Sequence, residues 1–145
     1  MDDNVTPILW ADDDSRGSLV PMVLRLKRNK FNVTEAVDYN EALEKLRSPG
    51  QFNAILLDVI LPYAKGAGAL EFDLGMKLAE EAPDICRSVR NVAFLTVVRP
   101  REVSDKYNGV VARYDGKVRF KYFDKAKLLE PNYPELVMQF LRQEG

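Results

Sequence analysis

The feature that most constrains the fold of this chain is a run of apolar residues that ends in a carboxylate. Residues 53–58 read NAILLD, and Pro62 follows four residues after Asp58. A continuously apolar run of this length is typical of a central parallel strand that is covered on both faces. A buried carboxylate is costly unless it is paired, hydrogen-bonded or bound to a metal. Asp58 therefore needs either a partner or a chemical role.

The rest of the chain alternates between strand patterns and helix patterns. Strands are predicted at 7–11, 31–37, 53–58, 91–98 and 117–123. Helices are predicted from Ser18, from Asp38, over 74–82, weakly within 99–116, and from Asn132. The helix from Asp38 has the spacing of a capping box, with Glu41 three residues later. The alternation predicts an α/β fold with a doubly wound, five-stranded parallel sheet and helices on both faces.

Polar residues stand at or near the ends of these predicted strands. They are Asp12 and Asp13 after the first strand, Asp58 at the end of the third, Thr96 in the fourth and Lys121 in the fifth. Because ligands of such sheets bind beyond the carboxyl ends of the strands, we expect these side chains to converge. Clustered carboxylates repel one another, and Mg²⁺ relieves the repulsion while leaving coordination positions open for phosphate oxygens. A lysine and a threonine can hold further phosphate oxygens, so Asp58 becomes a candidate nucleophile in phosphoryl transfer.

Composition narrows the possible functions. The chain has 145 residues, enough for one domain, and its 21 basic and 22 acidic residues give a net charge of −1. We therefore expect no nucleic-acid or membrane binding through overall charge. Histidine is absent, which removes the commonest general base, and the single cysteine, Cys86, is interpreted as a bystander. No secretory signal is recognised, and a cytoplasmic location is expected.

At these residues the sequence resembles the response-regulator receiver domains of two-component signalling. The resemblance rests on ILWADDD, ILLDVILP, VAFLTVV and VRFKYF and covers nearly the whole chain. It implies a flavodoxin-like strand order of 2-1-3-4-5 and a single receiver domain over residues 1–145. It also implies that Asp58 is the phosphoacceptor and that Thr96 and Lys121 complete the site. The implied Mg²⁺ ligands are Asp12, Asp13, Asp58 and the backbone carbonyl of Ile60.

The resemblance further implies partners rather than an enzymatic activity on other substrates. A sensor histidine kinase or a phosphotransfer protein would donate the phosphoryl group, and a downstream protein would read the phosphorylated face. The chain would catalyse only its own phosphotransfer and a slow autodephosphorylation. It would act as a stand-alone receiver or as a fragment of a longer protein.

Several positions depart from the family pattern. Val97 replaces a small residue after the strand-four hydroxyl, Val118 stands where an aromatic switch residue is usual, and Tyr122 replaces a proline after the lysine. Ile60 cannot hydrogen-bond a water that attacks the acyl phosphate, which predicts a long-lived phosphorylated state. An inserted loop is predicted at about 63–73, so Gly75 rather than an earlier glycine opens the third helix. The insertion either contacts the site or a partner, or is a tolerated surface loop.

Two other functions remain open. A receiver-like scaffold that no longer switches is favoured by Val97 and Val118, but the complete acidic site opposes it. Hydrolysis of phosphate esters would use Asp12 and Asp14 after the first strand, but this leaves the burial of Asp58 unexplained. An ordinary solvated surface is the preferred interpretation of Arg99, Arg101 and Arg113, with a basic patch near the fourth helix as the alternative.

Overall fold

The main sheet has five parallel strands. The computed structural model describes residues 5–15, 17–48, 51–64, 70–71 and 74–143. The strand order is β2-β1-β3-β6-β7, with bounds β1 (Thr6–Ala11), β2 (Phe31–Ala36), β3 (Ala54–Leu57), β6 (Asn91–Thr96) and β7 (Arg119–Asp124). Because β4 and β5 belong to a separate small sheet, this order is the predicted 2-1-3-4-5. The fold class predicted from the strand and helix alternation is therefore confirmed.

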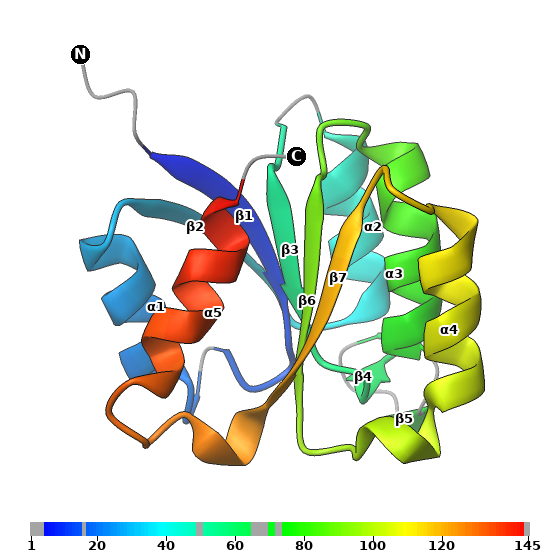
Figure 1. Ribbon diagram of the computed structural model, residues 1–145. Coiled ribbons are helices and arrows are strands. Elements are labelled where there is room, and N and C mark those ends of the chain that lie inside the picture. The colour runs from blue at the N-terminus through cyan, green and yellow to red at the C-terminus, as the bar shows by residue number, and fades with distance from the viewer. Residues whose placement is uncertain (1–4, 16, 49–50, 65–69, 72–73, 144–145) are drawn as a thin grey trace.

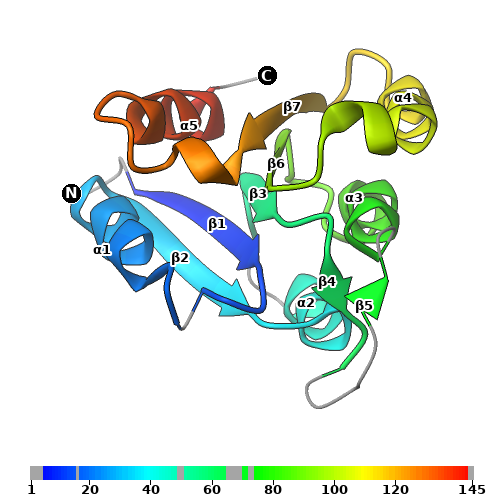
Figure 2. The ribbon, with the colours of Figure 1, turned by 90° about the horizontal axis from the view of Figure 1, so that it is seen from below.

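Helices cover both faces of the sheet (Figures 1 and 2). α1 (Val20–Arg28) and α5 (Tyr133–Arg142) lie on one face, and α2 (Tyr39–Arg47), α3 (Leu74–Ile85) and α4 (Ser104–Arg113) lie on the other. Alternate residues of β1 feed the two layers: Ile8 and Trp10 pack with α1 and α5, whereas Leu9 and Ala11 pack on the opposite side. In the described part of the chain, no helix has the length and apolar character needed to span a membrane.

The helix starts show which local signals act. Asp38 caps α2 by accepting the backbone N–H of Glu41 at 2.7 Å, and the Glu41 carboxylate accepts the N–H of Val37 at 2.7 Å. The capping-box prediction is thus confirmed, with the return bond displaced by one residue. The prediction that Ser18 caps the first helix is wrong, because its hydroxyl donates to Asp14 and the helix begins at Val20. α4 is a full ten-residue helix rather than a weak one.

Two short elements lie between the end of β3 and α3. β4 (Leu61–Pro62) pairs antiparallel with β5 (Leu70–Glu71), and both lie at the edge of the main sheet where its strands end (Figure 1). β4 directly precedes the insertion predicted at 63–73, and β5 lies within it. Residues 65–69 and 72–73 of the predicted insertion lie outside the described residues. α3 begins at Leu74, so Gly75 does stand at its start as predicted.

Candidate functional site

Strand pairing brings the first two site carboxylates together. β1 and β3 are neighbours, and Ala11 is paired with Leu57, so the residues that follow them also lie side by side. The backbone N–H of Asp58 donates to the carbonyl of Ala11 at 3.0 Å, which extends the pairing by one residue. Asp12 is fully buried and Asp58 is 5% exposed. The predicted convergence of these two residues is therefore seen in the structure.

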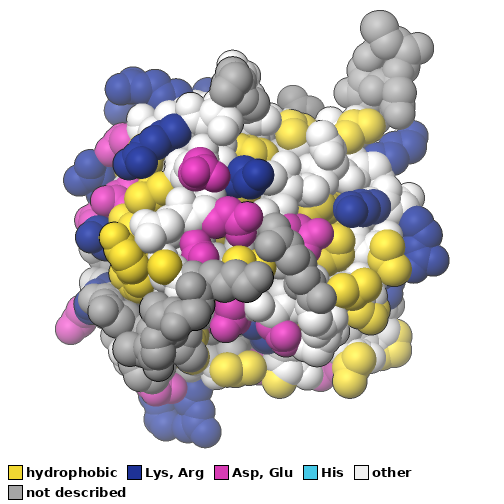
Figure 3. Space-filling model, turned by 180° about the vertical axis from the view of Figure 1, so that it is seen from behind, with side chains coloured by type: hydrophobic (Ala, Val, Ile, Leu, Met, Phe, Trp, Pro, Cys, Tyr) yellow, Lys and Arg dark blue, Asp and Glu magenta, His cyan; other side chains and the backbone are white. Residues whose placement is uncertain are grey.

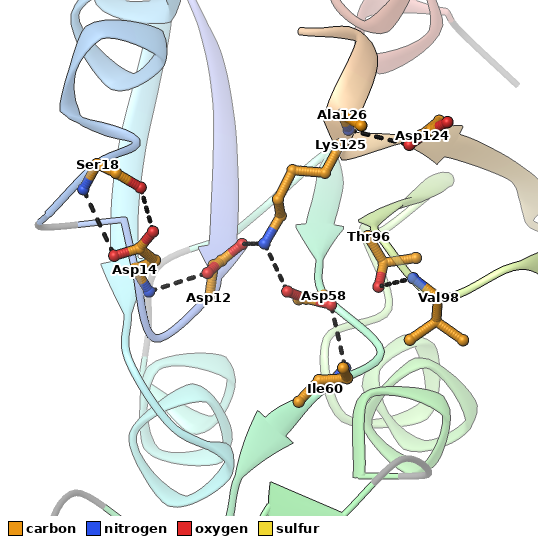
Figure 4. Close-up of polar contacts among 10 residues, drawn as sticks. All are labelled: Asp12, Asp14, Ser18, Asp58, Ile60, Thr96, Val98, Asp124, Lys125 and Ala126. Atoms are coloured by element: carbon orange, nitrogen blue, oxygen red, sulfur yellow. Dashed lines mark hydrogen bonds and ion pairs between the residues drawn. The ribbon is translucent and has the colours of Figure 1, made fainter.

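A lysine ammonium neutralises this pair. The Nζ atom of Lys125 lies 2.7 Å from Oδ2 of Asp12 and 2.5 Å from Oδ2 of Asp58 (Figure 4). The other oxygen of Asp58 accepts the backbone N–H of Ile60 at 3.0 Å. Asp58 is therefore paired and hydrogen-bonded through both oxygens, which explains how a carboxylate is tolerated at the end of a buried strand.

The predicted placement of Lys121 in the site is wrong. Lys121 is an exposed residue within β7, and its ammonium lies 5.7 Å from the centre of the Phe123 ring. The pairing of β6 with β7 gives the reason. Thr96 is paired with Asp124, so the first residue beyond the end of the sheet is Lys125, four residues after Lys121.

Two local signals in the sequence point to Lys125. Asp124 is a residue type that caps helices, and in the structure its side chain accepts the N–H of Ala126 at 2.9 Å at the start of η2 (Lys125–Lys127). The aromatic residue expected three positions before the lysine is then Tyr122, not Val118. The register of a strand with alternating exposed cations, such as Arg119 and Lys121, is not determined by its apolar pattern alone.

Burial dominates the electrostatics of the carboxylates. Burial raises the pKa of Asp12 to about 6, against the opposing attraction of Lys125. Burial, followed by the negative charge of Asp58, also raises the pKa of Asp13. Burial is the largest single effect on the pKa of Lys125 and lowers it, but the two carboxylates together outweigh burial and raise this pKa, so the lysine stays charged. Keeping these carboxylates buried and charged therefore costs free energy, and the single ammonium of Lys125 does not fully offset that cost.

Thr96 and Tyr122 are connected through the backbone of Val98. Thr96 is buried at the end of β6, and its hydroxyl oxygen accepts the N–H of Val98 at 3.2 Å. The carbonyl of Val98 accepts the phenol O–H of Tyr122 at 2.7 Å. The Tyr122 ring is stacked on Phe94 at 5.7 Å and meets Tyr107 edge-on at 5.9 Å. Figure 4 shows Thr96 beside Asp58 and its hydrogen bond to Val98. With the bond from Tyr122, two hydrogen bonds therefore connect the Thr96 hydroxyl to a partly buried aromatic ring.

Two of the expected departures from the family pattern now look different. Val118 is a buried core residue, and the interpretation that it replaces the switch aromatic is wrong because Tyr122 holds that spacing relative to Lys125. Likewise Ala126, not Tyr122, follows the site lysine. Val97 is 60% exposed, so its side chain lies on the surface. Its predicted effect on access to the site stays a prediction.

The donor set fits Mg²⁺, although the residues are not arranged around an ion. In the described part of the chain, no group of three acidic or cysteine side chains is positioned to hold a metal. The buried Oδ2 atom of Asp12, however, has no hydrogen bond of good geometry despite its ion pair with Lys125. An under-coordinated carboxylate oxygen beside Asp58, with the exposed Asp13 next to it, offers the hard oxygen ligands that Mg²⁺ prefers.

The alternative of one basic patch formed by Arg99, Arg101 and Arg113 does not hold in the structure. Arg99 precedes the 3₁₀ helix η1 (Pro100–Glu102), to which Arg101 belongs, and both come before the start of α4. Arg113 is the last residue of that ten-residue helix. A helix of this length separates its ends by about 15 Å.

Similarity to solved structures identifies the fold. No protein-family model and no curated protein matches the chain. A receiver domain protein from Methanospirillum hungatei JF-1 matches with a TM-score of 0.66 at 21% identity, over 93% of this chain and 89% of that one. A response regulator from Thermotoga maritima matches with a TM-score of 0.65 at 19% identity, over 96% and 100%. This chain has the fold of a response-regulator receiver domain.

A third match is the structure of a phosphorylated protein. It is a response regulator from Burkholderia pseudomallei, with a TM-score of 0.63 and 20% identity over 94% of this chain. This chain spans 66% of that one. The Burkholderia structure contains a phosphorylated aspartic acid, a calcium ion and citrate.

Proposed function

We propose that this chain is a phosphoacceptor receiver of a two-component phosphorelay and that Asp58 accepts the phosphoryl group. The observation that carries the proposal is the convergence of Asp12, Asp58 and Lys125 at the carboxyl edge of a sheet with the receiver strand order. The proposed donor is the phosphohistidine of a sensor kinase or of a phosphotransfer protein. This histidine must belong to another protein, since the chain itself has none. The proposed setting is cytoplasmic.

In the proposed reaction, a carboxylate oxygen of Asp58 attacks the phosphorus atom. The new P–O bond forms as the P–N bond to the donor imidazole breaks, and that nitrogen retains the bonding electrons and takes up a proton. The N–H of Ile60 holds the Asp58 carboxylate at 3.0 Å, and Lys125 supplies a positive charge for the transferred oxygens. Such transfers need positioning and neutralisation of charge rather than a separate base.

Mg²⁺ is the proposed cofactor of this site. Asp12, Asp13, Asp58 and the carbonyl of Ile60 are the proposed ligands, and the bound ion would neutralise phosphate charge that the carboxylates repel. Lys125 sits on both buried carboxylates in the present arrangement. We therefore propose that Lys125 exchanges one of its carboxylate contacts for a contact with a phosphate oxygen when Asp58 is phosphorylated.

The proposed response to phosphorylation runs through Thr96. If its hydroxyl turns to donate to the phosphate, the N–H of Val98 loses its acceptor, and the Val98 carbonyl that holds Tyr122 is free to move. Tyr122 is 2.7 Å from that carbonyl and packs in a three-ring cluster with Phe94 and Tyr107, so its ring would move with the backbone. The altered face near α4 and β7 is the proposed contact for a downstream partner.

A non-switching scaffold is the alternative function. Of the two residues that favoured it, Val118 no longer does so, since Tyr122 occupies the aromatic position relative to Lys125. Val97 remains, as an exposed valine beside the site. A chain that binds Mg²⁺ but never acquires a phosphoryl group would be this scaffold.

The experiment measures the intact mass of the protein after incubation with Mg²⁺ and a small acyl-phosphate donor. The wild type and Lys121→Ala should both gain one phosphoryl group, whereas Asp58→Asn should gain none. Lys125→Ala should gain it much more slowly, because its ammonium is the one beside Asp58. Absence of any gain in the wild type, in the presence of bound Mg²⁺, would favour the scaffold.

A further inference from the structure

The end of the molecule opposite the acidic site carries a basic pocket. It lies where α3 and α4 end and beside the first residues of β6 and β7, and its volume is about 330 Å³. Figure 3 shows Lys and Arg side chains gathered at this end of the molecule, at the upper left of the view. Four of the lining residues are cations and one is an acid: Arg87, Arg90, Arg113, Lys117 and Asp84.

The positive charge of this pocket exceeds what its acidic residue can neutralise. Arg113 forms an ion pair with Asp84, with 2.7 Å between Nη2 and Oδ2, which balances one charge. Arg87, Arg90 and Lys117 leave three positive charges around the same cavity, on a chain whose net charge is −1. Like charges that surround one concavity repel each other and concentrate an electric field that attracts anions.

Helix-end interactions account for only part of this cluster. Cations are favourable in the last turn of a helix, and Arg113 is the last residue of α4. Arg90 donates through Nη1 to the carbonyl of Arg87 at 2.8 Å, but a guanidinium has five N–H donors. Arg87 and Lys117 lie beyond the ends of α3 and α4, respectively. The surplus charge is therefore not explained by capping of these helices.

We propose that this pocket binds an oligophosphate, either free in solution or as the phosphate chain of a nucleotide. Three cations around a cavity of 330 Å³ match a ligand with several closely spaced negative charges. Arginine guanidinium groups bind phosphate oxygens in pairs of hydrogen bonds, and buried Val89 and Val118 in the lining keep part of the pocket apolar. The pocket lies where β6 and β7 begin, at the opposite end of the strands from Asp58, so the proposed site is separate from the acidic one.

The test is a titration of the ¹⁵N-labelled full chain in metal-free buffer, followed by amide chemical shifts. The probes are tripolyphosphate, ATP and adenosine, and the dissociation constant for at least one phosphate compound should lie below about 1 mM. The shifts should concentrate in residues 83–90 and 113–118. Tighter binding of ATP than of tripolyphosphate identifies a nucleotide as the ligand, and equal or weaker binding of ATP identifies the phosphate chain alone.

A matched pair of double variants locates the binding. Arg87→Gln with Lys117→Gln should weaken the phosphate compounds at least about tenfold, since each lost cation removes a charge-assisted contact. Lys27→Gln with Arg28→Gln on α1 changes the net charge equally and should leave the affinity unchanged. The proposal is overturned by an equal loss in both double variants, by shifts spread over the surface, or by no saturation with either phosphate compound.

Discussion

Replacing Asp12 by asparagine should stabilise the protein in metal-free buffer at pH 7. Burial raises the pKa of Asp12 from 3.8 to about 6, so the folded state disfavours its charged form relative to the unfolded chain. A difference of this size corresponds to about 3 kcal/mol at pH 7. Asparagine removes the charge, but its amide NH₂ must then face the Asp14 N–H or Lys125, both of which are donors. Part of the gain is lost in this way, and we expect a net stabilisation of about 1 to 2 kcal/mol.

The pH dependence has a definite sign. The folded-state pKa of Asp12 is higher than the unfolded one, so the folded state binds the proton more tightly. The destabilisation by Asp12 grows as the pH rises from about 4 to about 6 and is complete above that range. The advantage of Asp12→Asn over the wild type should therefore be large at pH 7.5 and should shrink towards pH 4.

The assay is urea unfolding followed by the fluorescence of Trp10. Trp10 is the single tryptophan of the chain and is fully buried, so its emission reports unfolding. Asp14→Asn is the matched control: hydrogen bonding from Ser18 lowers the pKa of Asp14, so losing that charge should not stabilise the fold. A free energy of unfolding for Asp12→Asn that is equal to or below that of the wild type at pH 7.5 would show that the buried charge of Asp12 does not destabilise the fold.

Three further comparisons test other parts of the structure. Gly75→Ala should destabilise the protein by about 1 to 3 kcal/mol in urea unfolding, because a Cβ atom would lie 2.1 Å from the carbonyl oxygen of Asp58. Gly109→Ala in α4, where a Cβ meets nothing within 4 Å, should instead stabilise the protein by about 0.5 to 1 kcal/mol. Equal effects of the two substitutions would contradict the close packing at Gly75. Lys125→Met should raise the pKa of Asp12 measured by carboxyl ¹³C NMR, because the charge of Lys125 lowers it, whereas Lys121→Met should leave it unchanged. The reverse pattern would place Lys121 in the site. Tyr122→Phe should lower the free energy of unfolding by about 0.5 to 1.5 kcal/mol, because the hydrogen bond to the Val98 carbonyl is lost. A Tyr122 ring that gives the same NMR signals with and without phosphorylation would contradict its proposed movement.

The sequence predicts the buried parts of this protein better than its edges. The apolar run around Asp58 determines a strand covered on both faces, and the place of that strand beside the first one brings Asp12 and Asp58 together. β7 lies at the edge of the sheet, and its exposed face carries Arg119 and Lys121. The apolar pattern therefore does not determine at which residue this strand ends. The lysine that reaches the site is determined by pairing with β6, a long-range contact that the apolar pattern of β7 does not encode.

The error in the lysine changes the interpretation of the whole edge strand. With Lys121 as reference, Val118 occupied the aromatic position and weakened the case for switching. With Lys125 as reference, Tyr122 occupies it and is hydrogen-bonded to the backbone that holds Thr96. The inserted segment after Pro62 is a different case, because its Gly and Ala content specifies little local structure.

The proposed role of Asp58 is tested by identifying the residue that carries the phosphoryl group. The protein is phosphorylated with an acyl-phosphate donor and Mg²⁺, treated with borohydride, which reduces an aspartyl phosphate to homoserine, and digested for peptide mass measurement. We expect homoserine at position 58 and unmodified aspartate at positions 12 and 13. Homoserine at position 12, or at neither strand end, would contradict it.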